Sequence, residues 1–168
     1  MNLDDSVRRI SLANGRGIAV VDTIDFEMVS RYSWWLHTGG YAKAYTGGGR
    51  KNPKQIYMHR LIMRAEAGQE MDHRNGNKLD NRRSNLRFCT RSQNMANISA
   101  HVDGLNKLKG VTFDRRWNKY YARIQVEGRR IWLGNFQYAY EAAQAYACAS
   151  AKYFGEYAAV SPVTMVKE

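Results

Sequence analysis

Residues 71–97 hold the side chains whose types and spacing could do chemistry, in the run MDHRNGNKLDNRRSNLRFCTRSQNMAN. Asp72 and Asn94 carry hard oxygen ligands, the kind that Mg²⁺ and Mn²⁺ prefer in proteins. His73 is an imidazole that could take a proton from water. The run is also rich in arginine, which binds phosphate through paired hydrogen bonds. Together these residue types suit the hydrolysis of a phosphodiester.

Two strands and a helix must position these side chains. His73 is expected to end the first strand, Asn85 to stand just before the second, and Asn94 to lie in the first turns of the helix. The connection between the strands is rich in Gly, Asn and Asp, as loops are. The expected elements are a strand at 70–73, a loop at 74–85, a strand at 86–90 and a helix from 91 onward.

The spacing from His73 to Asn85 and on to Asn94 resembles the HNH motif of phage intron-encoded homing endonucleases. That resemblance implies a ββα-metal nuclease in which His73 is the general base and Asn85 orients its ring. It also implies that Asp72 and Asn94 hold one divalent metal, Mg²⁺ or Mn²⁺, against the scissile phosphate. The N-terminal stretch is similar to phage HNH proteins too. His59 resembles a histidine that recurs ahead of the motif in that family, and we assign it no chemistry.

Five arginines surround these residues, and by themselves they could form a solvated basic face. Beside a metal site we interpret them as contacts to DNA phosphates. They are Arg74, Arg82, Arg83, Arg87 and Arg91.

The composition favours a nucleic-acid partner. The chain has 168 residues, with 26 Lys and Arg against 15 Asp and Glu, which gives a formal charge of +11 and indicates a polyanion bound with salt-dependent affinity. No transmembrane run or signal peptide is visible, so we predict a soluble cytoplasmic protein, in a host cell if phage-encoded, with no membrane partner. Cys89 and Cys148 lack CxxC spacing, which argues against a zinc ribbon or a disulfide framework.

The residues before the motif predict small hairpins and helices. Residues 8–22 alternate in polarity about an Asn-Gly pair, as a β-hairpin does. Aromatic residues interrupted by Gly39-Gly40 predict a second hairpin. The expected elements are a hairpin at 8–22, a helix at 26–32, a hairpin at 34–45, a strand at 55–58 and a helix at 59–65.

A change to polar, glycine-containing composition separates a second unit. We predict a nuclease domain at 1–98, a linker at 99–108 and a second domain at 109–168. Alternation in the second domain predicts three antiparallel strands with one apolar face, covered by an Ala-rich helix. The expected elements are strands at 109–114, 119–126 and 129–136, and a helix at 140–154 closed by Gly155.

This second unit, with KGV, IWLGNF, AAQAY and YFGEYA, resembles the APETALA-two or ethylene-response-factor DNA-binding domain. That family lays a three-stranded sheet into the major groove. Arg123 and Gln125 replace an acidic residue and an arginine of the plant pattern, and Thr112 stands where it has arginine. These departures forbid the transfer of any target sequence. The residues of the polar face expected to contact DNA are Trp117, Tyr121, Arg123, Gln125, Arg130 and Trp132.

The sequence thus predicts an α+β protein with an HNH ββα-metal unit, N-terminal hairpins and a small three-stranded antiparallel sheet packed on one helix. The expected activity is metal-dependent, site-directed cleavage of double-stranded DNA by a nicking homing endonuclease. No self-association pattern is visible, so a monomer without a protein partner is expected. The alternatives are a DNA-binding regulator with a non-functional nuclease half and a structural RNA-binding protein.

Overall fold

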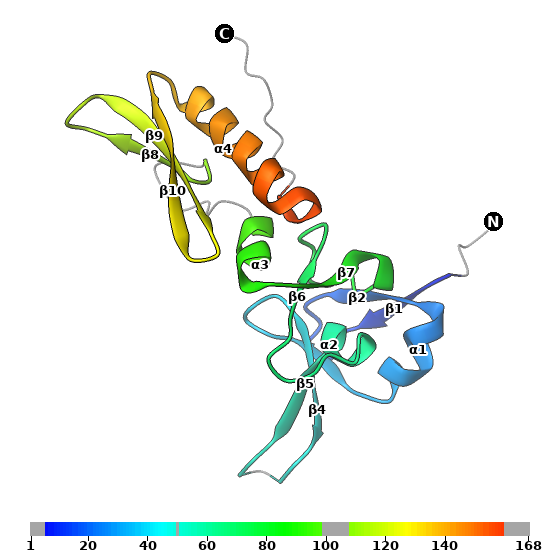
Figure 1. Cartoon of the computed structure of the whole chain (residues 1–168). Coiled ribbons are helices and arrows are strands. Elements are labelled where there is room, and N and C mark those ends of the chain that lie inside the picture. The colour runs from blue at the N-terminus through cyan, green and yellow to red at the C-terminus, as the bar shows by residue number, and fades with distance from the viewer. Residues whose placement is uncertain (1–5, 50, 99–107, 160–168) are drawn as a thin grey trace. The chain divides into compact units, whose positions relative to one another are not determined.

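The computed structural model describes residues 6–49, 51–98 and 108–159 (Figure 1). The chain folds as two compact units, residues 1–89 and 90–168. Both are built from short antiparallel sheets and helices, which confirms the predicted α+β class.

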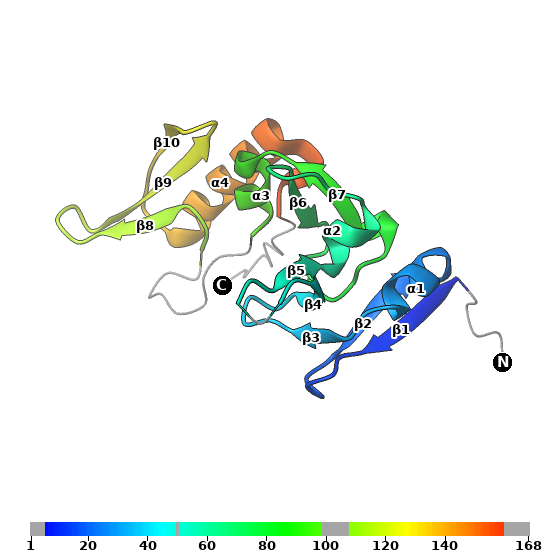
Figure 2. The ribbon, with the colours of Figure 1, turned by 90° about the horizontal axis from the view of Figure 1, so that it is seen from below.

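A hairpin and a helix open the first unit. β1 (Val7–Ser11) pairs antiparallel with β2 (Ile18–Asp22), and Gly15 takes a φ of 65° in the predicted Asn-Gly turn. α1 (Thr23–Ser30) follows β2 and lies against this hairpin (Figure 2). It begins earlier than predicted. The sequence does not reveal this start because Ile24, in the first turn, is exposed and so does not follow the apolar periodicity of a packed helix.

Three strands form the next sheet of this unit. β3 (Trp34–Leu36), β4 (Ala42–Gly47) and β5 (Lys54–Tyr57) pair in that order, which confirms the predicted hairpin. α2 (Met58–Ile62) follows β5. It ends earlier than predicted because Arg64 takes a φ of 51°, in the left-handed region that a helix cannot continue through.

Trp34 is the largest fully buried side chain of this unit, at 1% exposed. Its indole Nε1 donates a hydrogen bond of 2.7 Å to the carbonyl oxygen of Val29, which satisfies the one polar atom of the ring. The core around Trp34 therefore joins the β3–β4–β5 sheet to α1, α2 and the N-terminal hairpin. Its other buried members include Leu12, Val21, Met58, Ile62, Met71 and Leu86.

The predicted hairpin of the motif is present. β6 (Glu70–His73) pairs antiparallel with β7 (Leu86–Cys89), and a 3₁₀ turn, η1 (Arg83–Asn85), precedes β7. The loop between the strands is held by the N-terminal hairpin through a parallel bridge between Val20 and Asp80. The first unit thus supports the motif with segments far from it in sequence.

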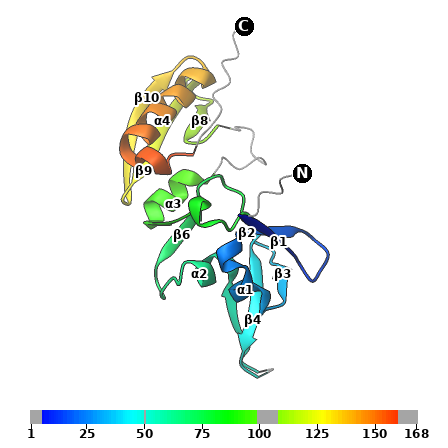
Figure 3. The ribbon, with the colours of Figure 1, turned by 90° about the vertical axis from the view of Figure 1, so that its right-hand side faces the viewer.

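The second unit contains the predicted sheet on a helix. β8 (Val111–Asp114), β9 (Lys119–Val126) and β10 (Arg129–Phe136) form an antiparallel sheet in the order β10-β9-β8. α4 (Ala139–Phe154) lies along one face of it, and the 3₁₀ turn η2 (Gly155–Tyr157) follows (Figure 3).

α3 (Arg91–Asn97) also belongs to the second unit, although the sequence placed the domain boundary after residue 98. Ala96 of this helix is buried in one cluster with Ile124, Ala149 and Phe154. The structure therefore divides the chain directly after β7. Of the predicted linker, residues 99–107 lie outside the described residues.

Among the helices in the described part of the chain, none is long and apolar enough to span a bilayer.

Candidate active site

His73 lies at the end of β6, in a cluster of aromatic rings. It is 5% exposed, and its ring centroid lies 5.2 Å from that of His59, with the planes at 77°. The ring of Tyr41 lies 5.8 Å from His73 and 5.2 Å from His59. Tyr57 stacks on His59 at 5.6 Å. α2 and the strands around β4 thus fix the surroundings of the imidazole.

Burial favours the neutral forms of both histidines. Desolvation lowers the pKa of His73, although the Asn81 side chain and the nearby carboxylates of Asp72 and Asp80 act in the opposite direction. The pKa of His59 is lowered to about 3, chiefly by burial and further by the neighbouring His73 and Arg60. A neutral imidazole at pH 7 can accept a proton, as the predicted general base must.

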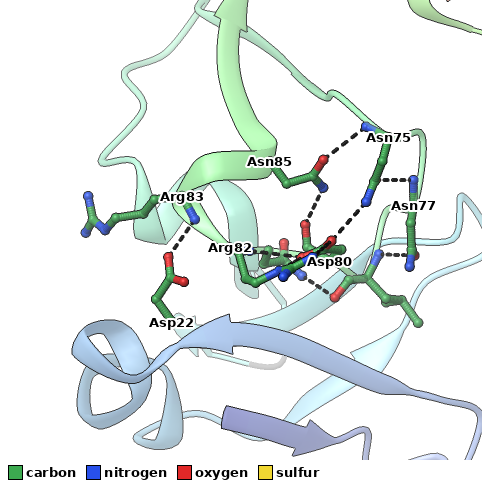
Figure 4. Close-up of polar contacts among 9 residues, drawn as sticks. Asp22, Asn75, Asn77, Asp80, Arg82, Arg83 and Asn85 are labelled. Carbon is green, nitrogen blue, oxygen red and sulfur yellow. Dashed lines mark hydrogen bonds and ion pairs between the residues drawn. The ribbon is translucent and has the colours of Figure 1, made fainter. Parts of the chain in front are cut away.

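Asn85 is fixed by the loop rather than by the imidazole (Figure 4). Its Oδ1 accepts a hydrogen bond from the backbone N–H of Asn75 at 3.0 Å, and its Nδ2 donates to the carbonyl oxygen of Asp80 at 2.7 Å. The Asn81 side chain, which is fully buried, lies near the His73 imidazole, and its Nδ2 donates to the Leu79 carbonyl oxygen at 3.1 Å. Any orienting effect of Asn85 on His73 therefore passes through the loop.

The loop carries its own charged pair. Arg82 donates to both carboxylate oxygens of Asp80, from Nε at 2.8 Å and from Nη2 at 2.7 Å. This pairing holds the pKa of Asp80 below its usual value. Asn75 Nδ2 donates to Asp80 as well, at 2.9 Å. Val20 closes the loop from β2, since its N–H donates to Leu79 and its carbonyl oxygen accepts from Asn81.

Asp72, the predicted metal ligand on β6, pairs with Arg87, its directly opposite residue on β7. Arg87 donates from Nε to one carboxylate oxygen at 2.7 Å and from Nη2 to the other at 3.0 Å. Both side chains are buried. In this structure the guanidinium of Arg87 is buried and bound to a carboxylate, and its phosphate contact stays a prediction.

The other four predicted phosphate-binding arginines are placed differently from Arg87. Arg74 and Arg91 are exposed. Arg82 is 41% exposed beside Asp80, and Arg83 is 48% exposed while it donates to Asp25 at 2.8 and 2.7 Å. Pairing to Asp25 raises the pKa of Arg83.

The carboxylate of Asp72 fits a metal ion that takes few ligands from the protein and the rest from water and substrate. Within residues 6–49, 51–98 and 108–159, no three His, Cys, Asp or Glu side chains are grouped to hold a metal ion. Each carboxylate oxygen of Asp72 keeps lone-pair capacity beside its bond from Arg87. Mg²⁺ commonly takes one or two protein ligands and completes its shell with water and phosphate oxygens. A single carboxylate from the first unit is compatible with that pattern.

Asn94, the second predicted metal ligand, lies in the middle of α3 in the second unit. The helix starts with a capping box, in which Thr90 Oγ1 accepts from the Gln93 N–H at 3.2 Å and Gln93 Oε1 accepts from the Thr90 N–H at 2.8 Å. The Asn94 N–H donates to the Thr90 carbonyl oxygen at 2.9 Å. Its metal contact stays a prediction.

The exposed face of the second unit carries the residues predicted to contact DNA. Trp132 is paired opposite Arg123 and Arg130 opposite Gln125, so these side chains are cross-strand neighbours. The Tyr121 ring stacks on Trp132, with centroids 5.1 Å apart, and the Arg123 guanidinium lies 5.9 Å from the Tyr121 ring.

Trp117 lies at the β8–β9 turn and is 76% exposed. Trp132 is 58% exposed. Large aromatic rings at the surface beside cations are typical of a surface that stacks on or packs against nucleic acid.

No motif or spacing in the sequence points to Tyr41, Tyr57 or Asn81 as residues of the site. Tyr41 and Tyr57 precede the motif, and only the fold brings Tyr41 to His73 and Tyr57 to His59. Asn81 is one of several amides in the loop, and nothing in its spacing distinguishes it. His59 was noticed through the resemblance alone, and only the structure places it against His73.

Two comparisons with known proteins show what this site is similar to. Residues 56–96 match the model of the HNH endonuclease family. The chain is also 29% identical over 164 residues to an uncharacterized HNH endonuclease of Acanthamoeba polyphaga mimivirus, an alignment that covers 96% of this chain and 84% of the viral protein. These matches confirm the predicted enzyme class, an HNH endonuclease, and imply a nuclease that acts on DNA.

Proposed function

We propose that this HNH endonuclease is a metal-dependent, site-directed enzyme of the homing type, which hydrolyses one phosphodiester bond in double-stranded DNA and nicks one strand first. The premise is the family match at residues 56–96. The observation that carries the proposal is the buried imidazole of His73, fixed between His59 and Tyr41 at the end of the matched hairpin.

His73 acts as the general base. Its lowered pKa leaves the imidazole neutral near pH 7, so it can take the proton of the attacking water. The rings of His59 and Tyr41 limit its rotation, and the buried Asn81 side chain lies near it. Asn85 supports this arrangement indirectly, because its hydrogen bonds to Asn75 and Asp80 hold the loop that carries Asn81.

Asp72 and Asn94 are the protein ligands for one divalent cation, Mg²⁺ or Mn²⁺. HNH nucleases generally use such a metal, and when bound it supplies charge stabilisation for the scissile phosphate and the leaving oxygen. Arg87 binds both oxygens of the Asp72 carboxylate and so fixes its orientation. Arg87 also limits the net negative charge at this position, which makes the metal dependent on phosphate ligands from DNA.

The sheet face of the second unit positions the enzyme on DNA. Arg123 and Arg130 would contact bases or phosphates, with Gln125 able to pair with adenine. Tyr121, Trp117 and Trp132 add apolar contact area. Arg74 is exposed next to His73 and Arg91 is exposed at the start of α3, and we assign both to phosphate contacts.

Nicking follows from asymmetry. The chain contains one HNH motif, and its two units differ from each other. A monomer bound through two unlike units would offer its nuclease to one strand only. The first product is therefore a nicked duplex.

A plasmid assay tests the activity. Supercoiled plasmid carrying DNA from either side of the enzyme's own gene is incubated with the full chain in Mg²⁺, Mn²⁺ or chelator. We expect open-circular DNA that depends on the metal, with linear DNA late or absent. Immediate linear product, with a rate that rises as the square of protein concentration, would instead indicate a cleaving dimer.

One observation favours a second function. The Asp72 carboxylate is already bound at both oxygens by Arg87, as it would be in a DNA-binding regulator whose nuclease half is inactive. Tight binding of the plasmid without cleavage in either metal would establish that regulator and refute the proposed endonuclease.

A further inference from the structure

α3 is too short to be stable alone. It has seven residues, Arg91–Asn97, and isolated helices of this length are marginal in water. The Thr90 capping box satisfies its first turn, which leaves its last carbonyl groups in need of partners. The helix that carries Asn94 must therefore be held by something outside itself.

Lys109 supplies those partners. Its ammonium Nζ donates to three backbone carbonyl oxygens at the C-terminal end of α3. These are the carbonyl oxygens of Met95 at 2.8 Å, Ala96 at 2.6 Å and Ile98 at 2.5 Å. A cation at this position also interacts favourably with the negative end of the helix dipole. Lys109 is half-buried, and this burial lowers the pKa of its ammonium to about 8.

The backbone that carries Lys109 is fixed to the sheet. Gly110 has a φ of 72°, and its carbonyl oxygen accepts a hydrogen bond of 3.0 Å from the Arg123 N–H. A Cβ at Gly110 would lie 2.0 Å from the Tyr146 ring, so only glycine allows this approach. The Lys109 side chain therefore starts from a rigid point.

Two further contacts hold the other sides of α3. Ser92 Oγ accepts a hydrogen bond of 3.1 Å from the Glu127 N–H in the β9–β10 turn. Ala96 packs with Ile124 and Phe154, and its carbonyl oxygen also accepts from the Ala159 N–H at 3.2 Å. The sheet and α4 thus form the surface against which α3 packs.

We propose that Lys109 is a positioning residue for catalysis, which ties the end of α3 to the second unit and thereby fixes Asn94. This inference rests on the proposed function, in which Asn94 is a metal ligand. It gives the second unit a role in cutting as well as in DNA binding, because the unit folds a helix of the catalytic motif.

The test uses the full chain with Lys109→Met, which keeps the length of the side chain and removes its donors. Lys109→Arg restores donors, and Lys152→Met, on an exposed lysine of α4, is the matched control. Amide hydrogen exchange of Asn94 and Ile98 is measured without metal, DNA affinity is measured in chelator, and cleavage is measured across a Mg²⁺ titration.

We expect Lys109→Met to speed exchange at both amides by about tenfold, as the net loss of one charge-assisted hydrogen bond would. Its cleavage rate should fall by about as much, and it should need more Mg²⁺, while DNA affinity changes less than about twofold. Lys109→Arg should recover both exchange protection and rate. Lys152→Met should match the wild type.

Unchanged exchange and cleavage in Lys109→Met would overturn the proposal. Loss of DNA affinity together with cleavage, not rescued by Lys109→Arg, would overturn it too, because Lys109 would then support the whole second unit. A wild type that cuts no DNA would refute the proposed function separately, and with it the catalytic part of this inference. The exchange rates report on the anchoring of α3 in every case.

Discussion

Asp72 and Arg87 form a buried ion pair across the β6–β7 hairpin, with two hydrogen bonds of 2.7 and 3.0 Å between the guanidinium and the carboxylate. Asp72 is thus both a proposed metal ligand and one half of a buried ion pair. Any substitution of Asp72 removes a proposed metal ligand and also leaves a cation buried without its partner.

We therefore expect Asp72→Ala to lower the free energy of unfolding by about 3–5 kcal/mol, the usual cost of breaking a buried pair on one side. Adding Arg87→Met should recover much of this stability without restoring cleavage. Chemical denaturation and the plasmid assay separate the two effects. Glu27→Ala, which breaks the exposed pair with Arg31, is the control and should cost at most about 1 kcal/mol. A double variant as unstable as Asp72→Ala would contradict the argument.

His73→Ala should lower the cleavage rate by about 10²–10⁴-fold, the typical loss with a general base. DNA affinity should stay nearly unchanged, because many basic contacts share the binding. His37→Ala is a suitable control, since it removes another imidazole of the first unit, whose ring centroid lies 6.0 Å from that of Tyr57. Single-turnover cleavage and a binding assay in chelator measure the two effects. Wild-type cleavage by His73→Ala would remove His73 from the mechanism.

Asn85→Ala should have a smaller effect on cleavage than Asp72→Ala or Asn94→Ala, because Asn85 acts through the loop. It removes two hydrogen bonds and leaves the backbone carbonyl of buried Asp80 without its donor, which costs about 1–3 kcal/mol, whereas the N–H of the exposed Asn75 can bind water. Denaturation should detect that loss. If Asn85→Ala abolishes cleavage at unchanged stability, Asn85 contacts the imidazole or the substrate directly.

The stability of the first unit should fall with acid because of His59. Its pKa is about 3 in the folded chain against an ordinary value of 6.5, so between these values the unfolded chain binds a proton that the folded chain does not. The free energy of unfolding therefore declines as pH drops from 6.5 toward 3, and is unaffected by this group above 6.5. His59→Phe should flatten the slope, measured by denaturation at several pH values. An unchanged slope would show that another group titrates.

Arg130→Ala and Trp132→Ala should each weaken DNA binding by about 1–3 kcal/mol. Arg130→Ala should also reduce the salt dependence of binding by about one phosphate contact, whereas Trp132→Ala should not. Lys152→Ala, on α4 rather than on the strands, provides the comparison. Equal affinity for all three variants and the wild type would mean that this sheet face does not bind DNA.

Local patterns in the sequence predicted the elements well. The Asn-Gly turn before β2, the β6–β7 hairpin and the alternation in β9 and β10 each arise from neighbouring residues, and each was found. The short helices were less accurate, since α1 exposes Ile24 in its first turn and α2 ends at a backbone conformation that no side-chain pattern reveals.

Long-range contacts were the part that the sequence could not reveal. Spacing drew attention to His73, yet its neighbours Tyr41 and Asn81 depend on how distant strands and loops pack. Arg87 appeared as one more cation in a basic run, and only its register opposite Asp72 shows that it is internal. Charge and spacing identify the types of residue in a site, whereas packing decides which of them face each other.

The parallel bridge between Val20 and Asp80 also bears on how this active centre could be moved between proteins. Val20 donates to the Leu79 carbonyl oxygen at 2.8 Å and accepts from the Asn81 N–H at 2.7 Å, so the N-terminal hairpin holds the loop of the matched segment in place. Residues 56–96 alone therefore lack the hairpin that holds their loop, and we do not expect them to form the site by themselves. A chimera that grafts this nuclease onto another DNA-binding protein must begin at or before β1, and gene recombination that preserves activity must break the chain there too.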